Sequence, residues 1–183
     1  MQSLCVFCGS SPGDRPEYLQ VARDAGRLIA QRGLTLVYGG GKVGLMGAAA
    51  DAALAAGGRV VGIIPQMLLD REVGHPGLSE LHVVTTLAER KLLMGELSGG
   101  FLTLPGGVGT LDELFEAWSW TQLDLHRKPS GLLNHAGYYD ALIAFLDHTV
   151  AEGFLRPRHR AALLVDTAVE PLLDQLQAAS RAA

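Results

Sequence analysis

Long apolar runs and clusters of positive charge are both missing from this 183-residue sequence. No stretch reaches the roughly 20 apolar residues of a membrane-spanning helix, and the start "MQSLCVFCGSSPG" lacks the basic end and apolar core of a secretory signal. A net charge of -4 without a Lys/Arg cluster argues against binding to nucleic acid or to an anionic membrane surface. We therefore expect a cytoplasmic protein that binds neither nucleic acid nor membrane.

Cysteine is also scarce, with only Cys5 and Cys8 present. Their CxxC spacing is typical of redox motifs. The surrounding residues, however, predict a buried strand, in which positions three apart point to opposite faces, so the two sulfur atoms cannot pair without breaking the strand. We interpret both thiols as small buried hydrophobic groups. The six histidines are scattered, with none spaced as a metal-binding pair, and we predict no metal site.

The sequence does contain enough apolar residues for a substantial core. With 48% hydrophobic and 19% charged residues, the chain suits one globular domain over residues 1–183. Short apolar runs predict strands near 3–8, 34–38, 59–64, 82–85, 101–104, 131–133 and 162–165. Amphipathic stretches between them predict helices near 16–32, 44–56, 87–97, 111–123, 138–151 and 169–179.

Strands that are apolar on both faces and alternate with helices indicate a parallel sheet covered on both sides. The predicted fold class is therefore α/β, a doubly wound, Rossmann-like parallel sheet with helices on both faces. In such a sheet, ligands bind at the carboxyl ends of the strands, beside a switch in strand order. Three glycine-rich loops fall at such ends, and a long irregular insertion is expected at 65–81. The three loops span residues 8–13, 38–47 and 104–110.

The second of these loops contains a GxGxxG pattern at Gly39, Gly41 and Gly44. A dinucleotide fold with this pattern needs an acidic residue about twenty positions later, at the end of the next strand, to bind the ribose hydroxyls. Ile64 and Pro65 occupy that place, which disfavours a nicotinamide cofactor. Neither glycine run ends in Gly-Lys-Ser/Thr, so the sequence does not fit a P-loop NTPase either.

The third loop, "LPGGVGT", favours the binding of a single phosphate. Glycines let backbone N–H groups approach an oxyanion closely, and a helix expected to start at Thr110 adds its free N–H groups and the positive end of its dipole. The alternative is an ordinary strand-to-helix turn in which glycine supplies a positive φ. Spacing alone leaves both interpretations open.

Several charged residues near this loop also have two interpretations. Thr110 to Glu113 matches a capping box, in which Glu113 serves only the helix start, yet a catalytic carboxylate fits the same place. Thr86 and Glu89 form a second candidate capping box. Arg90 suits either a solvated surface or an arginine fork facing the anion. Three further residues share a helical spacing that places them on one face, away from Glu113: Asp112, Glu116 and Ser119.

These motifs together resemble the LONELY GUY family, the cytokinin riboside 5′-monophosphate phosphoribohydrolases. "PGGVGTLDE" fits the pattern PGGxGTxxE, "ERK" precedes it by about one helix, and "YGGGKVGLMG" lies nearer the start. The resemblance extends over most of the chain. It implies hydrolysis of the N-glycosidic bond of an adenosine 5′-monophosphate, N6-modified or not, giving free base and ribose 5-phosphate, with no metal or organic cofactor.

The resemblance also assigns residues by position. It implies that Arg90 and Glu113 form the catalytic pair, and that the protein is a homodimer with its sites near the subunit interface. Substrate contacts are expected from Glu72, Lys91, Gly106, Gly107, Val108, Gly109, Thr110, Asp112 and Ser119, and from Gly9, Ser10, Gly40 and Gly41 in the other two loops.

Two departures from the family pattern concern the substrate base. Ala88 stands where many members have histidine, and Gly99 replaces a common acidic residue, so the preferred base stays open. Members have also been labelled lysine decarboxylases, a label that the chemistry disfavours. A pyridoxal enzyme needs a Schiff-base lysine, and none of the three lysines has a recognisable cofactor setting. The alternative function is a non-catalytic nucleotide-binding or carrier module.

Overall fold

A computed structural model describes residues 1–71 and 74–182 of the chain. Its centre is one seven-stranded sheet in which every neighbouring pair of strands is parallel. The strand order is β4-β3-β2-β1-β5-β6-β7, so the chain builds outward from β1 in one direction and then returns to build in the other. The strands are β1 (Ser3–Phe7), β2 (Thr35–Tyr38), β3 (Val60–Pro65), β4 (Glu80–Val84), β5 (Phe101–Thr103), β6 (Ser130–Leu133) and β7 (Leu163–Asp166).

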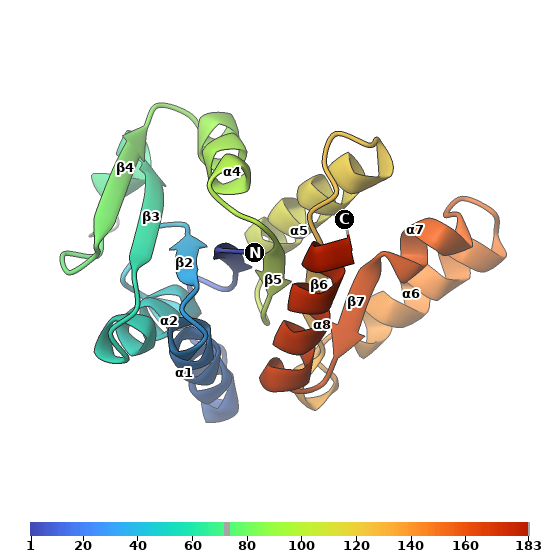
Figure 1. The fold of residues 1–183 in the computed structure, drawn as a ribbon, viewed down its shortest axis with the longest axis horizontal. Helices are drawn as coiled ribbons and strands as arrows, with labels where there is room; N and C mark the ends of the chain where they lie inside the picture. The colour runs from blue at the N-terminus through green and yellow to red at the C-terminus, as the bar shows by residue number, and fades with distance from the viewer. Residues whose placement is uncertain (72–73, 183) are drawn as a thin grey trace.

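Helices cover both faces of this sheet (Figure 1). On one face, α1 (Pro16–Gln31), α2 (Gly44–Ala55) and α8 (Val169–Ala182) pack over a continuous apolar core. On the other face, α4 (Leu87–Glu96), α5 (Val108–Gln122) and α6 (Asp140–Ala151) pack over two smaller apolar clusters. The fold class predicted from the sequence, a doubly wound parallel sheet, is therefore confirmed. Three shorter elements complete the chain: α3 (Gln66–Leu69), the 3-10 turn η1 (His135–Gly137) and α7 (Pro157–Ala161).

Cys5 and Cys8 are both free and buried, as the sequence indicated. Cys5 lies in the apolar cluster under α4 and α5, whereas Cys8 lies in the core under α1 and α2. Because they face opposite sides of the sheet, the two thiols cannot form a disulfide with each other. Each acts instead as a small core residue.

Three local predictions need correction. The helix expected from residue 111 begins at Val108, because Gly109, which suggested a loop, is already helical and Gly107 caps the helix. The insertion expected to be irregular contains α3, and β4 begins at Glu80 inside it. The short helix α7 was missed, because its "PRHRA" segment has no apolar periodicity.

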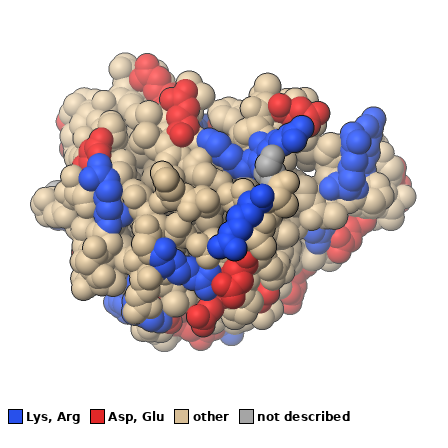
Figure 2. Space-filling view, in the orientation of Figure 1, with Lys and Arg blue, Asp and Glu red and all other residues tan. Residues whose placement is uncertain are grey.

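Charge is spread over the surface rather than concentrated. Figure 2 shows positive and negative side chains interspersed on the face of the molecule that it presents. Among the described residues, no helix combines the length and the apolar composition needed to cross a membrane.

Candidate active site

A cavity of about 260 Å³ opens where the carboxyl end of β1 meets the first turn of α5. The strand order reverses between β1 and β5, and such a reversal is where doubly wound sheets bind their ligands. The loop after β1, the helices α2, α3 and α4, and the start of α5 line the cavity with these residues: Cys8, Gly9, Ser10, Met46, Leu68, Arg90, Gly107, Val108, Gly109, Thr110 and Glu113.

The glycine loop before α5 does not need glycine for its backbone conformation. No residue between Leu104 and Thr110 has a positive φ, so the turn interpretation, in which glycine supplies that angle, does not apply. A Cβ placed on Gly107 or Gly109 would meet no described atom within 4 Å. Because these two positions carry no side chain, the N–H groups of the first helical turn stay open to the cavity, in the arrangement that binds oxyanions.

Thr110 and Glu113 do not form the capping box that the sequence suggested. The residue that caps α5 is Gly107, without a side-chain hydrogen bond, and Thr110 lies buried inside the helix. Glu113 is consequently free to face the cavity. The second candidate is confirmed: Thr86 accepts a hydrogen bond from the Glu89 amide at 3.0 Å, and Glu89 accepts one from the Thr86 amide at 3.2 Å.

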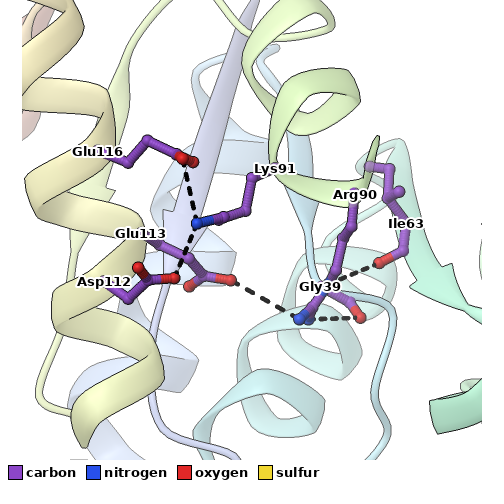
Figure 3. A network of polar contacts seen from close by, with 7 residues as sticks. All are labelled: Gly39, Ile63, Arg90, Lys91, Asp112, Glu113 and Glu116. Carbon is purple, nitrogen blue, oxygen red and sulfur yellow. Dashed lines mark hydrogen bonds and ion pairs between the residues drawn. The ribbon is translucent and has the colours of Figure 1, made fainter. Parts of the chain in front are cut away.

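Arg90 extends from α4 to the ends of two strands, as Figure 3 shows. Its Nε donates to the carbonyl of Ile63 at 3.1 Å and its Nη2 donates to the carbonyl of Gly39 at 3.0 Å. The remaining Nη1 lies 3.8 Å from Oε1 of Glu113. Gly39 has no room for a side chain, because a Cβ there would clash with the guanidinium. The sheet backbone therefore orients the arginine, and one of its nitrogens is left to face the carboxylate.

Glu113 is the most perturbed acid of the site. Its side chain is 12% exposed, and burial raises its pKa to about 7 even though Arg90 acts in the opposite direction. Asp112 and Glu116 raise the pKa further, and Lys91 lowers it. A carboxyl group that changes charge near neutral pH is suited to proton transfer and to stabilising positive charge.

Other residues expected to contact substrate lie outside this cavity. The ammonium of Lys91 pairs with Asp112 at 2.9 Å and with Glu116 at 3.1 Å. Ser119 donates to the carbonyl of Glu116 at 2.8 Å. Asp112, Glu116 and Ser119 do share a face of α5, as their spacing predicted, and that face borders a separate open hollow of about 800 Å³. Glu72 lies outside the described residues.

The first two glycine loops contribute unequally. Gly9 and Ser10 line the cavity, whereas Gly40 and Gly41 do not. Gly40 has a φ of 77° and packs against β3, and Gly41 forms an isolated bridge with Gly74. Gly106 lies behind the cavity wall and lines a neighbouring hollow of about 140 Å³.

Three lining residues were missed by the sequence interpretation: Cys8, Met46 and Leu68. Cys8 and Met46 belong to the apolar core under α1 and α2, so no signal in the sequence separates them from other core residues. Leu68 lies in the insertion at 65–81, whose length was the one signal that could have indicated it. Among the described residues, no group of three or more His, Cys, Asp and Glu side chains is arranged to hold a metal ion.

The fold and the cavity define a class: a Rossmann-like α/β protein in which an open helix start faces a buried carboxylate and arginine. A family model described as "possible lysine decarboxylase" matches residues 46–176. A cytokinin riboside 5′-monophosphate phosphoribohydrolase of Rhodococcoides fascians is 48% identical over 170 residues, 92% of this chain and 86% of that protein. The Arabidopsis thaliana phosphoribohydrolase LOG7 is 43% identical, over 95% of this chain and 80% of that protein.

These matches identify the family, and the chain belongs to the LONELY GUY family. Two solved structures with the same fold are more distant in sequence. A molybdenum cofactor binding protein from Rippkaea orientalis superposes with a TM-score of 0.74 at 22% identity, covering 97% of both chains. The molybdenum cofactor carrier protein of Chlamydomonas reinhardtii gives 0.73 at 21% identity, over 97% of this chain and 99% of that chain. At this level of identity the likeness concerns the fold alone.

Proposed function

We propose that this protein hydrolyses the N-glycosidic bond of adenosine 5′-monophosphates, N6-modified or unmodified, releasing the free base and ribose 5-phosphate. One observation carries the proposal: open N–H groups at the start of α5 and the largely buried pair Glu113 and Arg90 line the same cavity. The curated relatives, which are named for this reaction, support it.

In this proposal the 5′-phosphate binds at the start of α5, where Gly107 and Gly109 leave the amides bare. The bound phosphate fixes the ribose so that its anomeric carbon faces Glu113, and binding energy from the non-reacting phosphate is used for alignment. Gly9 and Ser10 line the same cavity from the end of β1 and complete the anion site. A bound metal or organic cofactor has no step in this proposal.

Glu113 acts on the bond that breaks. Departure of the base leaves positive charge on the sugar in an oxocarbenium-like state, which an adjacent carboxylate stabilises while it orients or deprotonates the attacking water. Arg90 faces the same region with one nitrogen, where it binds the phosphate or the ribose, or stabilises the departing base.

The cavity is smaller than the roughly 300–1,000 Å³ of typical ligand sites. We infer that the base extends beyond it, past the apolar side chains of Met46 and Leu68.

The experiment is incubation with AMP and with its N6-isopentenyl analogue, followed by chromatography of the released bases. We expect base release by the natural protein and a loss of about 10²–10⁴-fold in kcat for Glu113→Gln, the range associated with an acid–base group. Glu170→Gln, which removes a carboxylate from the exposed first turn of α8 on the other face of the sheet, is the matched control and keeps full activity.

Wild-type turnover by Glu113→Gln would contradict the role assigned to this residue. Tight binding of the nucleotides without base release under any condition would instead support the alternative, a carrier that holds a phosphorylated ligand. The fold that this chain shares with molybdenum cofactor carriers does not favour that alternative, because it concerns architecture alone.

We also propose that residues 1–183 act as one domain and that the protein is a cytoplasmic homodimer. Large apolar side chains exposed near the end of α5, in α6 and in the loop after it support the dimer, because exposed apolar patches often mark protein–protein contacts. Phe154 is 89% exposed, and Leu123, Leu125 and Phe145 are also exposed. Sedimentation velocity at micromolar concentration is expected to show a dimer, and a monomer alone would contradict this.

A further inference from the structure

Helix α5 carries three acidic residues within five positions, and only one of them faces the candidate active site. Glu113 lines the cavity, whereas Asp112 and Glu116 flank it on the neighbouring face of the helix. Such a concentration of negative charge is unfavourable unless a positive group compensates it. That group is Lys91, which reaches across from α4 to both flanking carboxylates (Figure 3).

Lys91 and Arg90 are adjacent in sequence but make different kinds of contact. Arg90 is held by two backbone carbonyls and lies 3.8 Å from Glu113. Lys91 makes two closer ion pairs, at 2.9 and 3.1 Å, and its side chain is 19% exposed. It does not line the 260 Å³ cavity, but it borders a small pocket on the other side of Glu113 together with Glu116. Glu113 therefore lies between the cavity and Lys91.

We propose that Lys91 is a positioning residue that acts through Glu113: it ties α4 to α5 and neutralises the two carboxylates that flank the catalytic acid. This inference rests on the proposed function, because it assumes that Glu113 works in its ionised form. It differs from the expectation that Lys91 contacts the substrate, because both of its observed partners belong to α5 and lie outside the cavity.

The charged groups that shift the pKa of Glu113 come from two helices. Helix α4 supplies Arg90 and Lys91, and α5 supplies Asp112 and Glu116. Burial, and Glu113 in addition, raise the pKa of the thiols of Cys5 in β1 and of Cys8 after it, so both stay neutral at ordinary pH and add no charge. Among these four charged groups, Lys91 is the one that lies outside the cavity and compensates the negative charge of Asp112 and Glu116.

The sign of each expected effect follows from these charges. Without Lys91, the uncompensated carboxylates raise the pKa of Glu113, so the ionised form appears only at higher pH. Replacing Glu116 with glutamine removes one negative charge and lowers the pKa instead. A single nearby charge shifts a carboxyl pKa by about one pH unit or more. The acidic limb of the pH–rate profile is therefore expected to move up for Lys91→Met and down for Glu116→Gln.

The test combines the pH dependence of base release from AMP with a direct titration of Glu113 by NMR of a protein labelled with ¹³C at glutamate carboxyls. The Glu113 signal is assigned by its loss in Glu113→Gln. We expect opposite shifts of about one pH unit for Lys91→Met and Glu116→Gln, and a near-normal profile for the double variant. Arg23→Gln, which removes a positive charge from the exposed face of α1, is the control and leaves the profile unchanged.

A Lys91→Met variant with a raised KM and an unchanged pH profile would overturn the proposal in favour of direct substrate contact. Unchanged titration of Glu113 in all variants would overturn it as well. If Lys91→Met does not fold, Glu116→Gln and Asp112→Asn still test the predicted downward shift. If the natural protein releases no base but the NMR titration shifts as expected, the proposed reaction fails while the electrostatic role of Lys91 stands.

Discussion

Two glycine-rich loops of this protein look alike in sequence and use their glycines differently. In the loop after β2, a Cβ on Gly39 would clash with Arg90, and one on Gly44 would clash with the backbone of Ser10. Gly44 also has a φ of 63°, which side-chain-bearing residues rarely adopt. In the loop after β5, Gly107 and Gly109 have ordinary φ angles and open space where a side chain would be.

The difference shows that a glycine pattern does not by itself locate a binding site. The loop after β2 carries the GxGxxG spacing associated with nucleotides, yet its glycines serve close packing of the backbone and the placement of one arginine. The loop after β5 lacks that spacing. Its Gly106 is closely packed against Thr110 and Gly9, but Gly107 and Gly109 leave amides uncovered at the start of α5. The two uses, close packing of the backbone and exposure of amides to a ligand, are distinguished by the space at each glycine where a Cβ would lie, and the sequence pattern does not distinguish them.

The largest effect that this comparison predicts is at Gly39. In Gly39→Ala the new methyl group displaces the guanidinium of Arg90, the flexible end of a side chain, so the fold is retained while the arginine loses its contact with the Gly39 carbonyl. Displacing a positioned group by about 1 Å can cost on the order of 100-fold in rate. We expect a loss of that size in kcat/KM for AMP, with a nearly unchanged thermal unfolding midpoint.

A double-mutant cycle with Arg90→Ala sharpens this prediction. If the only role of Gly39 is to leave room for the Arg90 side chain, Gly39→Ala causes no further loss of kcat/KM in a protein that already carries Arg90→Ala. Losses that add in the double variant, or wild-type activity of Gly39→Ala, would show that the packing of this loop is not what positions the arginine.

A smaller effect with a different signature is expected at Gly109. Alanine is a better helix former than glycine by about 0.5–1 kcal/mol, and its methyl group meets no described protein atom at this position. Gly109→Ala is therefore expected to be slightly more stable. Its methyl group projects from a residue that lines the cavity, and we expect a KM for AMP about tenfold higher, equivalent to about 1.4 kcal/mol.

Gly95→Ala is the matched control for this experiment. Gly95 lies within α4, and a Cβ there would make an ordinary contact of 3.7 Å with Trp120, away from the cavity. Calorimetry and initial-rate kinetics are expected to show a similar gain in stability with an unchanged KM. A Gly109→Ala variant that also keeps its KM would mean that the amides at the start of α5 do not contact the substrate.

The fold could be predicted from the sequence because its determinants are local. Apolar runs such as "VVGII" in β3 alternate with amphipathic helices, and that alternation specifies a parallel sheet. The start of α5 could not be predicted from propensity, because Gly107 and Gly109 disfavour a helix and tertiary context decides their conformation. The short helices α3 and α7 offered no periodic pattern to detect.

The candidate site could be predicted only in part. The glycine loop, Arg90 and Glu113 stand out by residue type and spacing, but their distance depends on which strands are neighbours in the sheet. The carbonyls of Gly39 and Ile63 that hold the arginine have no sequence signal, because every residue has a carbonyl. The pairing of Lys91 with two acids of α5 likewise becomes visible only when the helices are placed side by side.

The burial of Glu113 has a thermodynamic consequence that does not depend on any ligand. Because its pKa in the folded protein, about 7, exceeds the ordinary value of 4.5, the folded chain holds this proton more tightly than the unfolded chain does. Its contribution to the free energy of unfolding is therefore most favourable below the ordinary value and declines as the pH rises through the folded one. As the pH rises through about 7, the deprotonation that gives Glu113 its reactive charge also lowers the free energy of unfolding, so durability and reactivity oppose each other at one side chain.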